Sequence, residues 1–181
     1  MLSVSRTFLT QAKRSFHSSS AAFLKVGDCI PNVEVQGSSP AETYKAGELL
    51  GDKKRAILFG VPGAFTPGCT KSHLPGYIKQ ADDLKAKGVD FIACVSVNDA
   101  FVMNAWGESV GNKGEVKLLA DPAGSLAKAL DLNFDATGVL GNHRYKRFAA
   151  VVENGVVKKL FVEPDNTGLN VSLVENVIKQ L

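Results

Sequence analysis

The sequence predicts an α/β fold in which a central mixed β-sheet is flanked by helices on both faces. Two apolar runs, residues 55–61 and 89–97, show the continuous hydrophobicity of strands that are buried on both sides. Each of them leads into a segment with helical character. Near the end of the chain, Asn154-Gly155 separates two further runs in the pattern of an antiparallel hairpin. Strands that alternate with helices and close with a hairpin and a helix predict one mixed sheet.

Length and composition indicate a single globular domain. The chain has 181 residues, of which 45% are hydrophobic and 22% charged, as in soluble proteins with an ordinary core. No apolar run approaches the ~20 residues that a membrane-spanning helix needs. The three cysteines, Cys29, Cys69 and Cys94, include no Cys-x-x-Cys pair, and the histidines are scattered. We therefore expect no disulfide framework, no metal, no cofactor and no membrane partner.

The positive charge of the chain comes from its first residues. The formal net charge is +3, and residues 1–23 contain Arg6, Lys13 and Arg14 but no acidic residue. Without these three, 18 basic residues face 18 acidic ones. The rest of the chain, the neutral body, therefore has no net positive charge that would favour binding to nucleic acid.

Residues 1–22 have the composition of a mitochondrial transit peptide, being rich in Ser, basic and free of acids. No continuous apolar core of a secretory signal is present. The alternative is a tail without a targeting function. We expect a matrix address, with the cytosol or a peroxisome-like compartment as further locations, and a mature domain that spans residues 24–181.

The first half of the domain is expected to contain two strands and two helices. Residues 25–35 are extended, because Pro31 disfavours a helix, and residues 46–50 form a short helical turn. The strand 55–61 leads through a loop to a helix over 70–87. Pro75-Gly76 should interrupt that helix, since proline removes the hydrogen bond to the carbonyl of Lys71. The second strand, 89–97, should be followed by a helix over 100–109.

The second half is expected to complete the sheet. Residues 116–120 form a third strand, and Asp121-Pro122 has the composition of a helix start, with the helix ending near Leu130. Residues 133–144 are expected to be a loop. The hairpin strands then cover 147–153 and 156–162, and a closing helix covers 171–181.

One loop carries the strongest indication of chemistry. Residues 62–69 read PGAFTPGC, between a buried strand and a helix, which places Cys69 in the first helical turn. Unpaired backbone N–H groups at a helix N-terminus favour a thiolate over a thiol, and the thiolate is the reactive form. From position alone, an inert buried cysteine remains an equal alternative.

The residue pattern resembles the peroxiredoxin family. Pro62-x-x-x-Thr66-x-x-Cys69 matches its active-site signature, and the wider stretch GVPGAFTPGCTKSHLPGY, residues 60–77, is similar to the type II, atypical two-cysteine branch that includes peroxiredoxin 5. The resemblance continues through residues 96–102, 119–122 and 146–148. It covers the chain from about residue 24 to 181, and it implies a thioredoxin-like fold.

The resemblance also implies a peroxide-reducing site. Cys69 would attack the peroxide and become a sulfenic acid. Thr66 would accept a hydrogen bond from the peroxide and donate to the sulfur, and Pro62 would shield the thiolate from water. The family's arginine maps onto Arg147, whose fork of donors suits the peroxide oxygens and the sulfur. Arg144 is a second candidate, for which a surface role is equally open.

The sequence leaves two further questions about the cysteines open. His73 lies four residues after Cys69, on the same helical face, which allows a protease-like Cys–His nucleophile, but such a site also needs an orienting Asn or Asp. Cys29 is interpreted as an unreactive thiol.

The sequence departs from the family in the resolving cysteine. Animal members often carry it in the stretch that corresponds to residues 168–173 here, where Val171 takes its place. Plant type II members carry a cysteine that matches Cys94, within an apolar strand. A one-cysteine cycle with an external thiol is favoured, and Cys94 as resolving cysteine is the alternative.

The function expected from the resemblance is a thiol-dependent peroxidase with thioredoxin, glutaredoxin or glutathione as reductant, acting as a monomer or homodimer. The competing hypothesis is a redox-dependent binding, chaperone-like or peroxide-sensing protein with little turnover. A thiol–disulfide oxidoreductase is disfavoured, because the chain lacks a Cys-x-x-Cys motif.

Overall fold

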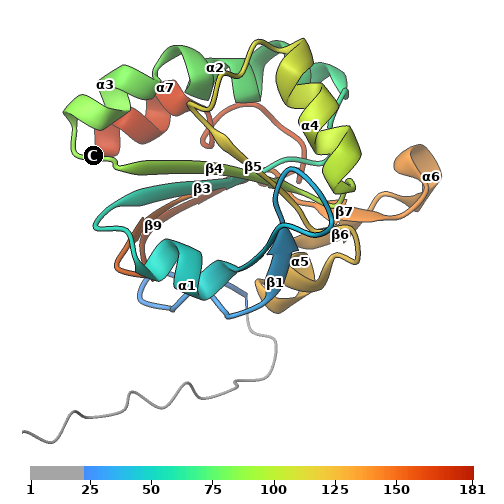
Figure 1. Cartoon of the computed structure of the whole chain (residues 1–181), viewed down its shortest axis with the longest axis horizontal. Helices are drawn as coiled ribbons and strands as arrows, with labels where there is room; N and C mark the ends of the chain where they lie inside the picture. Colours follow the sequence, from blue (N-terminus) through green and yellow to red (C-terminus); the bar gives the residue numbers. More distant parts are fainter. Residues whose placement is uncertain (1–22) are drawn as a thin grey trace, which may run out of the picture.

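The computed structural model describes residues 23–181, so the predicted transit peptide, residues 1–22, lies outside the described residues. The described chain forms a seven-stranded mixed sheet in the order β2-β1-β5-β4-β3-β8-β9, which confirms the predicted architecture (Figure 1). The strands of this sheet are β1 (Glu34–Gln36), β2 (Thr43–Lys45), β3 (Ala56–Gly60), β4 (Phe91–Ser96), β5 (Lys117–Ala120), β8 (Phe148–Glu153) and β9 (Val156–Val162).

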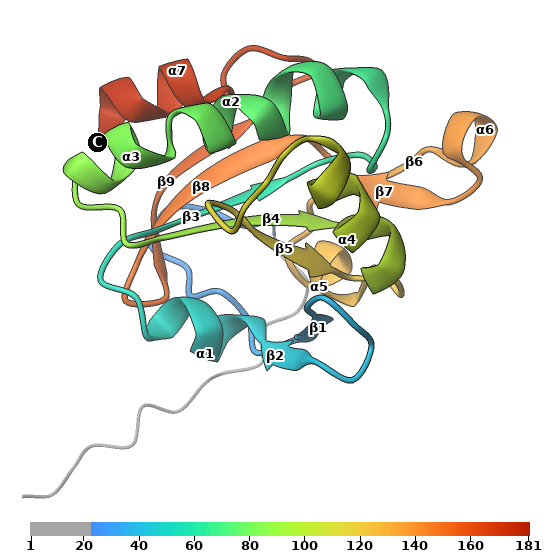
Figure 2. The same cartoon turned by 45° about the horizontal axis from the view of Figure 1, so that its top comes forward.

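Helices cover both faces of the sheet. One face carries α2 (Leu74–Lys79), α3 (Ala81–Ala86), α4 (Ala100–Ser109) and α7 (Val174–Val177). The other face carries α1 (Ala46–Gly51) and α5 (Ser125–Ala129). A separate two-stranded ribbon, β6 (Asn133–Asp135) and β7 (His143–Tyr145), projects with α6 (Thr137–Leu140) from the body (Figure 2).

The centre of the sheet is apolar on both sides, as the continuous hydrophobicity of its strands predicts. β3 runs parallel to β4 and antiparallel to β8. Alternate residues of β3 enter different cores. Ile57 and Phe59 pack under α2 and α4, and Leu58 packs toward α1 and α5. β3 therefore ends at a position fixed from four sides, and the loop that follows starts from a rigid point.

The hairpin prediction is confirmed. β8 and β9 pair in antiparallel fashion, and Asn154 and Gly155 join them with φ angles of 50° and 80°. Positive φ at both central residues is what a two-residue hairpin turn requires. A Cβ at Gly155 would also lie 3.2 Å from the Cα of Gly51, so the turn packs against the end of α1.

The predicted helix over 70–87 is divided differently from the expectation. Helical backbone begins at Pro67, continues as a π-turn over Cys69–His73, and becomes α2 at Leu74. Pro75 lies inside this continuous helical backbone, directly after the π-turn, so the hydrogen-bond pattern changes from π to α next to the proline. The helical path itself breaks further on, at Gln80, between α2 and α3.

Three expectations for the second half are wrong in detail. The helix near Asp121 begins only at Ser125, because Gly124 adopts a left-handed conformation with φ of 64° and turns the chain first. The Asp121 carboxylate still accepts the N–H groups of Ser125 and Ala127. Residues 133–144 are the β6–α6–β7 ribbon rather than a loop, and the closing helix begins at Val174 rather than at residue 171.

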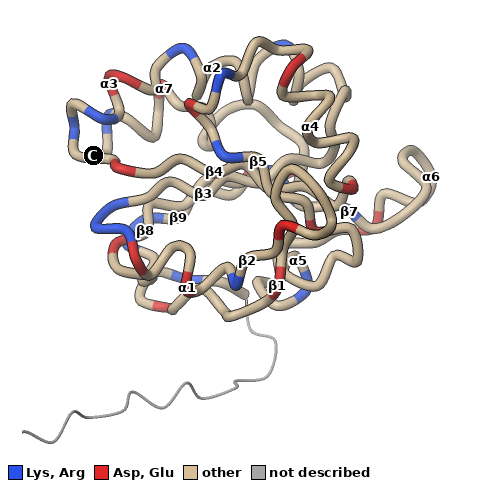
Figure 3. The backbone as a smooth tube through the Cα atoms, viewed as in Figure 1, with Lys and Arg blue, Asp and Glu red and all other residues tan. Residues whose placement is uncertain are grey.

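Charged residues of both signs are interspersed along the described chain (Figure 3). Among residues 23–181, no helix is both long and apolar enough to cross a membrane. The neutral body inferred from composition therefore presents mixed charges around β3 and β4, which contain no charged residue.

Candidate active site

Cys69 lies at the end of the loop that follows β3. Helical backbone starts two residues earlier, and the N–H of Thr70 donates to the carbonyl of Thr66 at 3.0 Å. Cys69 is therefore in the first turn, as predicted, and its side chain is fully buried. The N–H of Leu74 donates to the carbonyl of Cys69, five residues back, which makes this turn a π-turn, a feature frequent at functional sites.

The guanidinium of Arg147 contacts the sulfur of Cys69. Arg147 directly precedes β8, and its Nη1 lies 3.2 Å from Sγ of Cys69. Its Nε donates to the carbonyl of Thr167 at 3.1 Å, and the residue is only 3% exposed. Arg147 therefore presents a fixed, charged donor to the sulfur. The structure thus brings together two residues that are 78 positions apart in the chain.

His73 holds the same guanidinium from the other side. Its Nε2 lies 3.1 Å from the carbonyl of Ser172, which can only accept, so Nε2 carries the proton. Nδ1 then accepts from Nη1 of Arg147 at 3.3 Å. Burial, and then the positive charge of Arg147, lower the pKa of His73 to about 3. A neutral imidazole is therefore an acceptor for Arg147, and it cannot serve as the base of a Cys–His pair while it does so.

The loop before Cys69 is held by an asparagine that sequence reasoning did not single out. Oδ1 of Asn98, at the end of β4, accepts from the N–H of Ala64 at 2.9 Å and from Oγ of Ser96 at 2.7 Å. Nη1 of Arg144 lies 3.4 Å both from this oxygen and from the carbonyl of Pro62. Arg144 therefore contacts the loop and not the sulfur. The chain motif Val-Asn-Asp is a signal that could have pointed to Asn98.

Thr66 and Phe65 complete the loop. The hydroxyl of Thr66 donates to the carbonyl of Gly63 at 2.8 Å, not to the sulfur of Cys69 as the sequence analysis expected. Its oxygen retains lone pairs for a further donor. Phe65 is exposed and has a φ of 61°, which is unfavourable for a bulky residue. The strain falls at the tip of the loop that presents Cys69.

Trp106 fastens the π-turn to α4. Its Nε1 donates to Oγ1 of Thr70 at 3.0 Å, and the indole is fully buried in the core. The contact ties the residue next to Cys69 to the helix that follows β4.

The comparisons agree with this geometry. The family model named Redoxin matches residues 25–178. Peroxiredoxin-2E-2, chloroplastic, of Oryza sativa subsp. japonica is 44% identical over 172 residues, which are 91% of this chain and 75% of that protein. The structure of reduced Prx3 from Vibrio vulnificus in complex with H2O2 superimposes with a TM-score of 0.81 at 46% identity, covering 88% of this chain and 100% of the other. Peroxiredoxin 5 from Alvinella pompejana gives 0.74 at 36% identity, covering 87% and 99%.

The chain belongs to the peroxiredoxin family. It is a thiol-dependent peroxidase, an oxidoreductase that acts on peroxides, as the resemblance implied. The thioredoxin-like fold and the likeness to the peroxiredoxin 5 branch are confirmed with it.

The other two cysteines of this peroxiredoxin occupy different environments. Cys94 lies in the middle of β4, fully buried between Phe59 of β3 and Leu118 of β5. Burial, and then the neighbouring Cys69, raise the pKa of the Cys94 thiol. Cys29 is exposed, and so is Val171, the residue at the position where the sequence resemblance placed the resolving cysteine of animal members. All three cysteines are free thiols in this structure.

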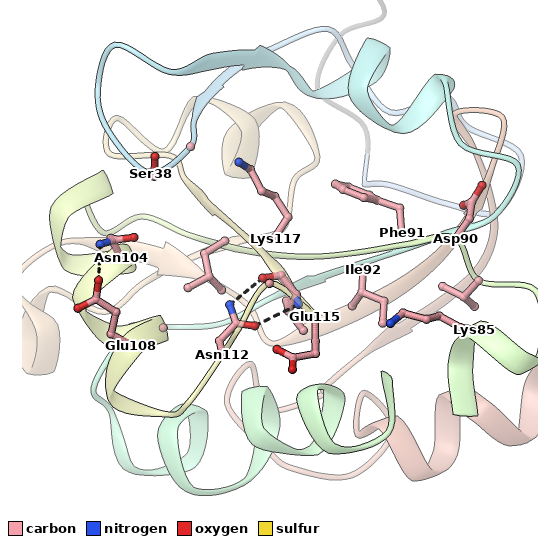
Figure 4. A pocket seen from close by; sticks show the side chains of 16 residues that line it. Ser38, Lys85, Asp90, Phe91, Ile92, Asn104, Glu108, Asn112, Glu115 and Lys117 are labelled. Carbon is pink, nitrogen blue, oxygen red and sulfur yellow. Dashed lines mark hydrogen bonds between the residues drawn. The ribbon is translucent and has the colours of Figure 1, made fainter. Parts of the chain in front are cut away.

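A cavity of about 440 Å³ lies away from this site (Figure 4). It opens at the N-terminal ends of β4 and β5, whereas Cys69 follows the C-terminal end of β3. Its polar side chains have partners within the chain: Lys117 donates to Glu42, and Asn112 bonds the backbone of Val116. Within residues 23–181, no three His, Cys, Asp or Glu side chains cluster as metal ligands do.

The depressed pKa of His73 predicts an acid-sensitive component of stability. Between about pH 6.5 and pH 3 the unfolded chain binds a proton on this residue that the folded chain does not. The unfolding free energy should therefore fall as the pH drops through that window, by at most about 1.4 kcal/mol per unit from this group. Urea unfolding measures this free energy for the wild type and for His73→Gln at each pH in the window. The two curves of unfolding free energy against pH should converge as the pH falls.

The exposed His143 supplies the matched control. His143→Gln should follow the wild type at every pH. If the His73→Gln curve also stays parallel to the wild type, His73 does not resist protonation in the folded protein.

Proposed function

We propose that Cys69 is the residue that attacks the peroxide, with Arg147, Thr66 and Pro62 as its partners. The observation that carries this assignment is the 3.2 Å contact between Nη1 of Arg147 and Sγ of Cys69 in a buried site. The substrates we propose are hydrogen peroxide and organic hydroperoxides, with peroxynitrite as a further candidate. A role in antioxidant defence and redox homeostasis would follow from this activity.

In the proposed reaction the thiolate attacks the distal oxygen of the peroxide. The S–O bond forms as the O–O bond breaks, and the proximal oxygen leaves as hydroxide or alkoxide and takes up a proton. Cys69 is oxidised to the sulfenic acid and the peroxide is reduced to water or an alcohol. Nη1 of Arg147 lies where negative charge passes from sulfur to oxygen, and its fork of donors can stabilise both. The oxygen of Thr66 can accept from the peroxide while its hydroxyl proton is donated to the carbonyl of Gly63.

Recycling is proposed to use an external thiol. That thiol displaces water from the sulfenic acid to form a mixed disulfide, and a second thiol releases Cys69. The candidates are glutathione, glutaredoxin and thioredoxin. The raised pKa of Cys94 supports this one-cysteine cycle, because a resolving cysteine attacks as a thiolate. A Cys69–Cys94 disulfide is the alternative, and it would have to form in the middle of the sheet.

Location and assembly are proposed from the sequence. Residues 1–22 would direct the chain to the mitochondrial matrix, leaving a domain over 24–181, and the cytosol or a peroxisome-like compartment would be further locations. The support is the basic, acid-free composition of that segment. The active unit would be a monomer or a homodimer.

Two substitutions test the assignment of the site. Cys69→Ser should abolish peroxide consumption with the fold intact, because a hydroxyl cannot supply a thiolate. Arg147→Lys should slow the reaction with peroxide on the order of 100-fold, because an ammonium cannot reproduce the fork. Peroxide consumption with a thiol donor, followed by stopped flow, measures both.

Arg55→Lys is the control for the arginine, since Arg55 pairs with Glu153 at the surface. It should leave the rate unchanged. Turnover by Cys69→Ser, or a wild type that binds partners but consumes no peroxide, would contradict the proposal.

The recycling step predicts the behaviour of Cys94→Ser. The variant should keep its peroxidase activity with glutathione or glutaredoxin. In both wild type and variant, peroxide alone should leave a sulfenic acid on Cys69 that dimedone traps, and excess peroxide should carry it to irreversible acids. Cys29→Ser is the control. Peptide mapping that finds a Cys69–Cys94 disulfide in most wild-type molecules would rule out the one-cysteine cycle.

The targeting proposal predicts that the protein isolated from mitochondria lacks about its first 20 residues. A segment of that length is typical of targeting sequences. Mass spectrometry of the N-terminus in fractionated cells measures this. Full-length protein confined to the cytosol would refute the assignment.

A further inference from the structure

Glu163 is a buried acid that the peroxidase mechanism does not use. It directly follows β9 and is only 1% exposed. Its Oε1 accepts three hydrogen bonds, from the N–H groups of Asn170 and Ser172 at 2.8 and 2.9 Å and from Oγ of Ser172 at 2.7 Å. Among the described residues, Oε2 has no hydrogen-bond partner. A buried oxygen without a partner requires an explanation.

Glu163 stands opposite Arg147 in the hairpin. Phe148 pairs with Val162 at the end of the β8–β9 ladder, and the N–H of Glu163 donates to the carbonyl of Arg147 at 3.0 Å. Residues directly opposite each other point to the same side, with Cβ atoms about 4.5–5.5 Å apart. Two buried, oppositely charged residues are therefore neighbours, yet the guanidinium contacts Cys69 and the carboxylate contacts Ser172.

A chain of hydrogen bonds also connects Glu163 to the sulfur. Ser172, held by Glu163, offers its carbonyl to Nε2 of His73 at 3.1 Å and to the hydroxyl of Tyr77 at 2.8 Å. His73 accepts from Arg147, and Arg147 contacts Cys69. The loop over residues 163–173 is thus fixed by Glu163 at one end and fixes the acceptor of Arg147 at the other.

We propose that the carboxylate of Glu163 is the positioning group that keeps Arg147 in place when Cys69 loses its charge. The thiolate is the direct counter-charge of Arg147 in the reduced protein. Oxidation to sulfenic acid removes that charge and leaves a buried guanidinium, which is costly without a neighbouring anion. Glu163 supplies a permanent anion that does not take part in the reaction. The proposal rests on Cys69 being the nucleophile.

The carboxylate of Glu163 is held by three donors, which converge on its Oε1. Arg147 stands opposite it, just beyond the last pair of the β8–β9 ladder. Asp165 is the other acid of the same loop, but it is exposed and accepts from the backbone N–H groups of Thr167 and Gly168. It provides a matched control at which charge can be removed from the same loop without removing a buried acid.

A double-mutant cycle on stability tests the proposal without any peroxide. Glu163→Gln removes the charge and keeps an oxygen for the three donors. Cys69→Ser imitates the uncharged sulfur of the oxidised protein. Glu163→Gln should raise the unfolding constant about tenfold more in the Cys69→Ser background than in the wild type, within the range found for coupled neighbours. Asp165→Asn should show no such difference between the two backgrounds.

The reactivity of Cys69 supplies a readout whose sign separates charge from structure. Removing a nearby negative charge favours the thiolate, so Glu163→Gln should shift the midpoint of Cys69 alkylation down by about half to one pH unit. If Glu163 served only to hold the loop, its loss would loosen Arg147 and shift the midpoint upward. Asp165→Asn should leave the midpoint in place.

The carboxyl carbon of Glu163 in the wild-type protein provides a test that needs no variant. NMR of protein labelled at the glutamate carboxyls should show Glu163 ionised at pH 7. A protonated Glu163, an upward alkylation midpoint, or equal effects of Glu163→Gln in both backgrounds would each overturn the proposal. Failure of Cys69→Ser to abolish peroxidase activity would instead overturn the proposed function, and the stability cycle would be unaffected by that result.

Discussion

The contact between the Arg147 guanidinium and the Cys69 sulfur is the interaction on which the site depends. It joins the first helical turn after β3 to the start of β8, and β3 and β8 are antiparallel neighbours in the sheet. Burial strengthens the contact, but it also removes the guanidinium from water. That desolvation costs free energy unless the cation finds other partners within the protein. His73, Thr167 and the loop that ends at Ser172 supply those partners. Much of the C-terminal quarter of the chain therefore helps to hold the side chain of Arg147.

The sequence predicted the parts of the fold that local patterns determine. The strands near residues 55–61 and 89–97 and the Asn154-Gly155 hairpin are where apolarity and turn chemistry place them. Cys69 could be found for the same reason, because its loop, its helix start and its signature are contiguous in the chain. The start of α5 was missed because Gly124 redirects the chain after Asp121, and the β6–β7 ribbon was missed because its short, polar strands lack an apolar period.

The rest of the site could not be derived from spacing. Arg147 came from the family resemblance alone, since nothing near it in the chain indicates a sulfur 78 residues away. Asn98 and Glu163 look like ordinary polar residues at strand ends, and only the topology shows that one holds the loop and the other stands behind the arginine. His73 was visible as a neighbour of Cys69, but its role as an acceptor depends on a carbonyl 99 residues further on.

The π-turn at Cys69–His73 has a consequence for how this region can vary. It carries one residue more than a regular helical path, and that extra residue sets the rotation of everything after it. A deletion of one residue within the turn would leave a regular helical path, with the imidazole three rather than four residues after Cys69. Substitutions in this stretch can be absorbed locally, whereas a change of length would separate the imidazole from the guanidinium. The spacing of the two residues is therefore a constraint as strict as their identity.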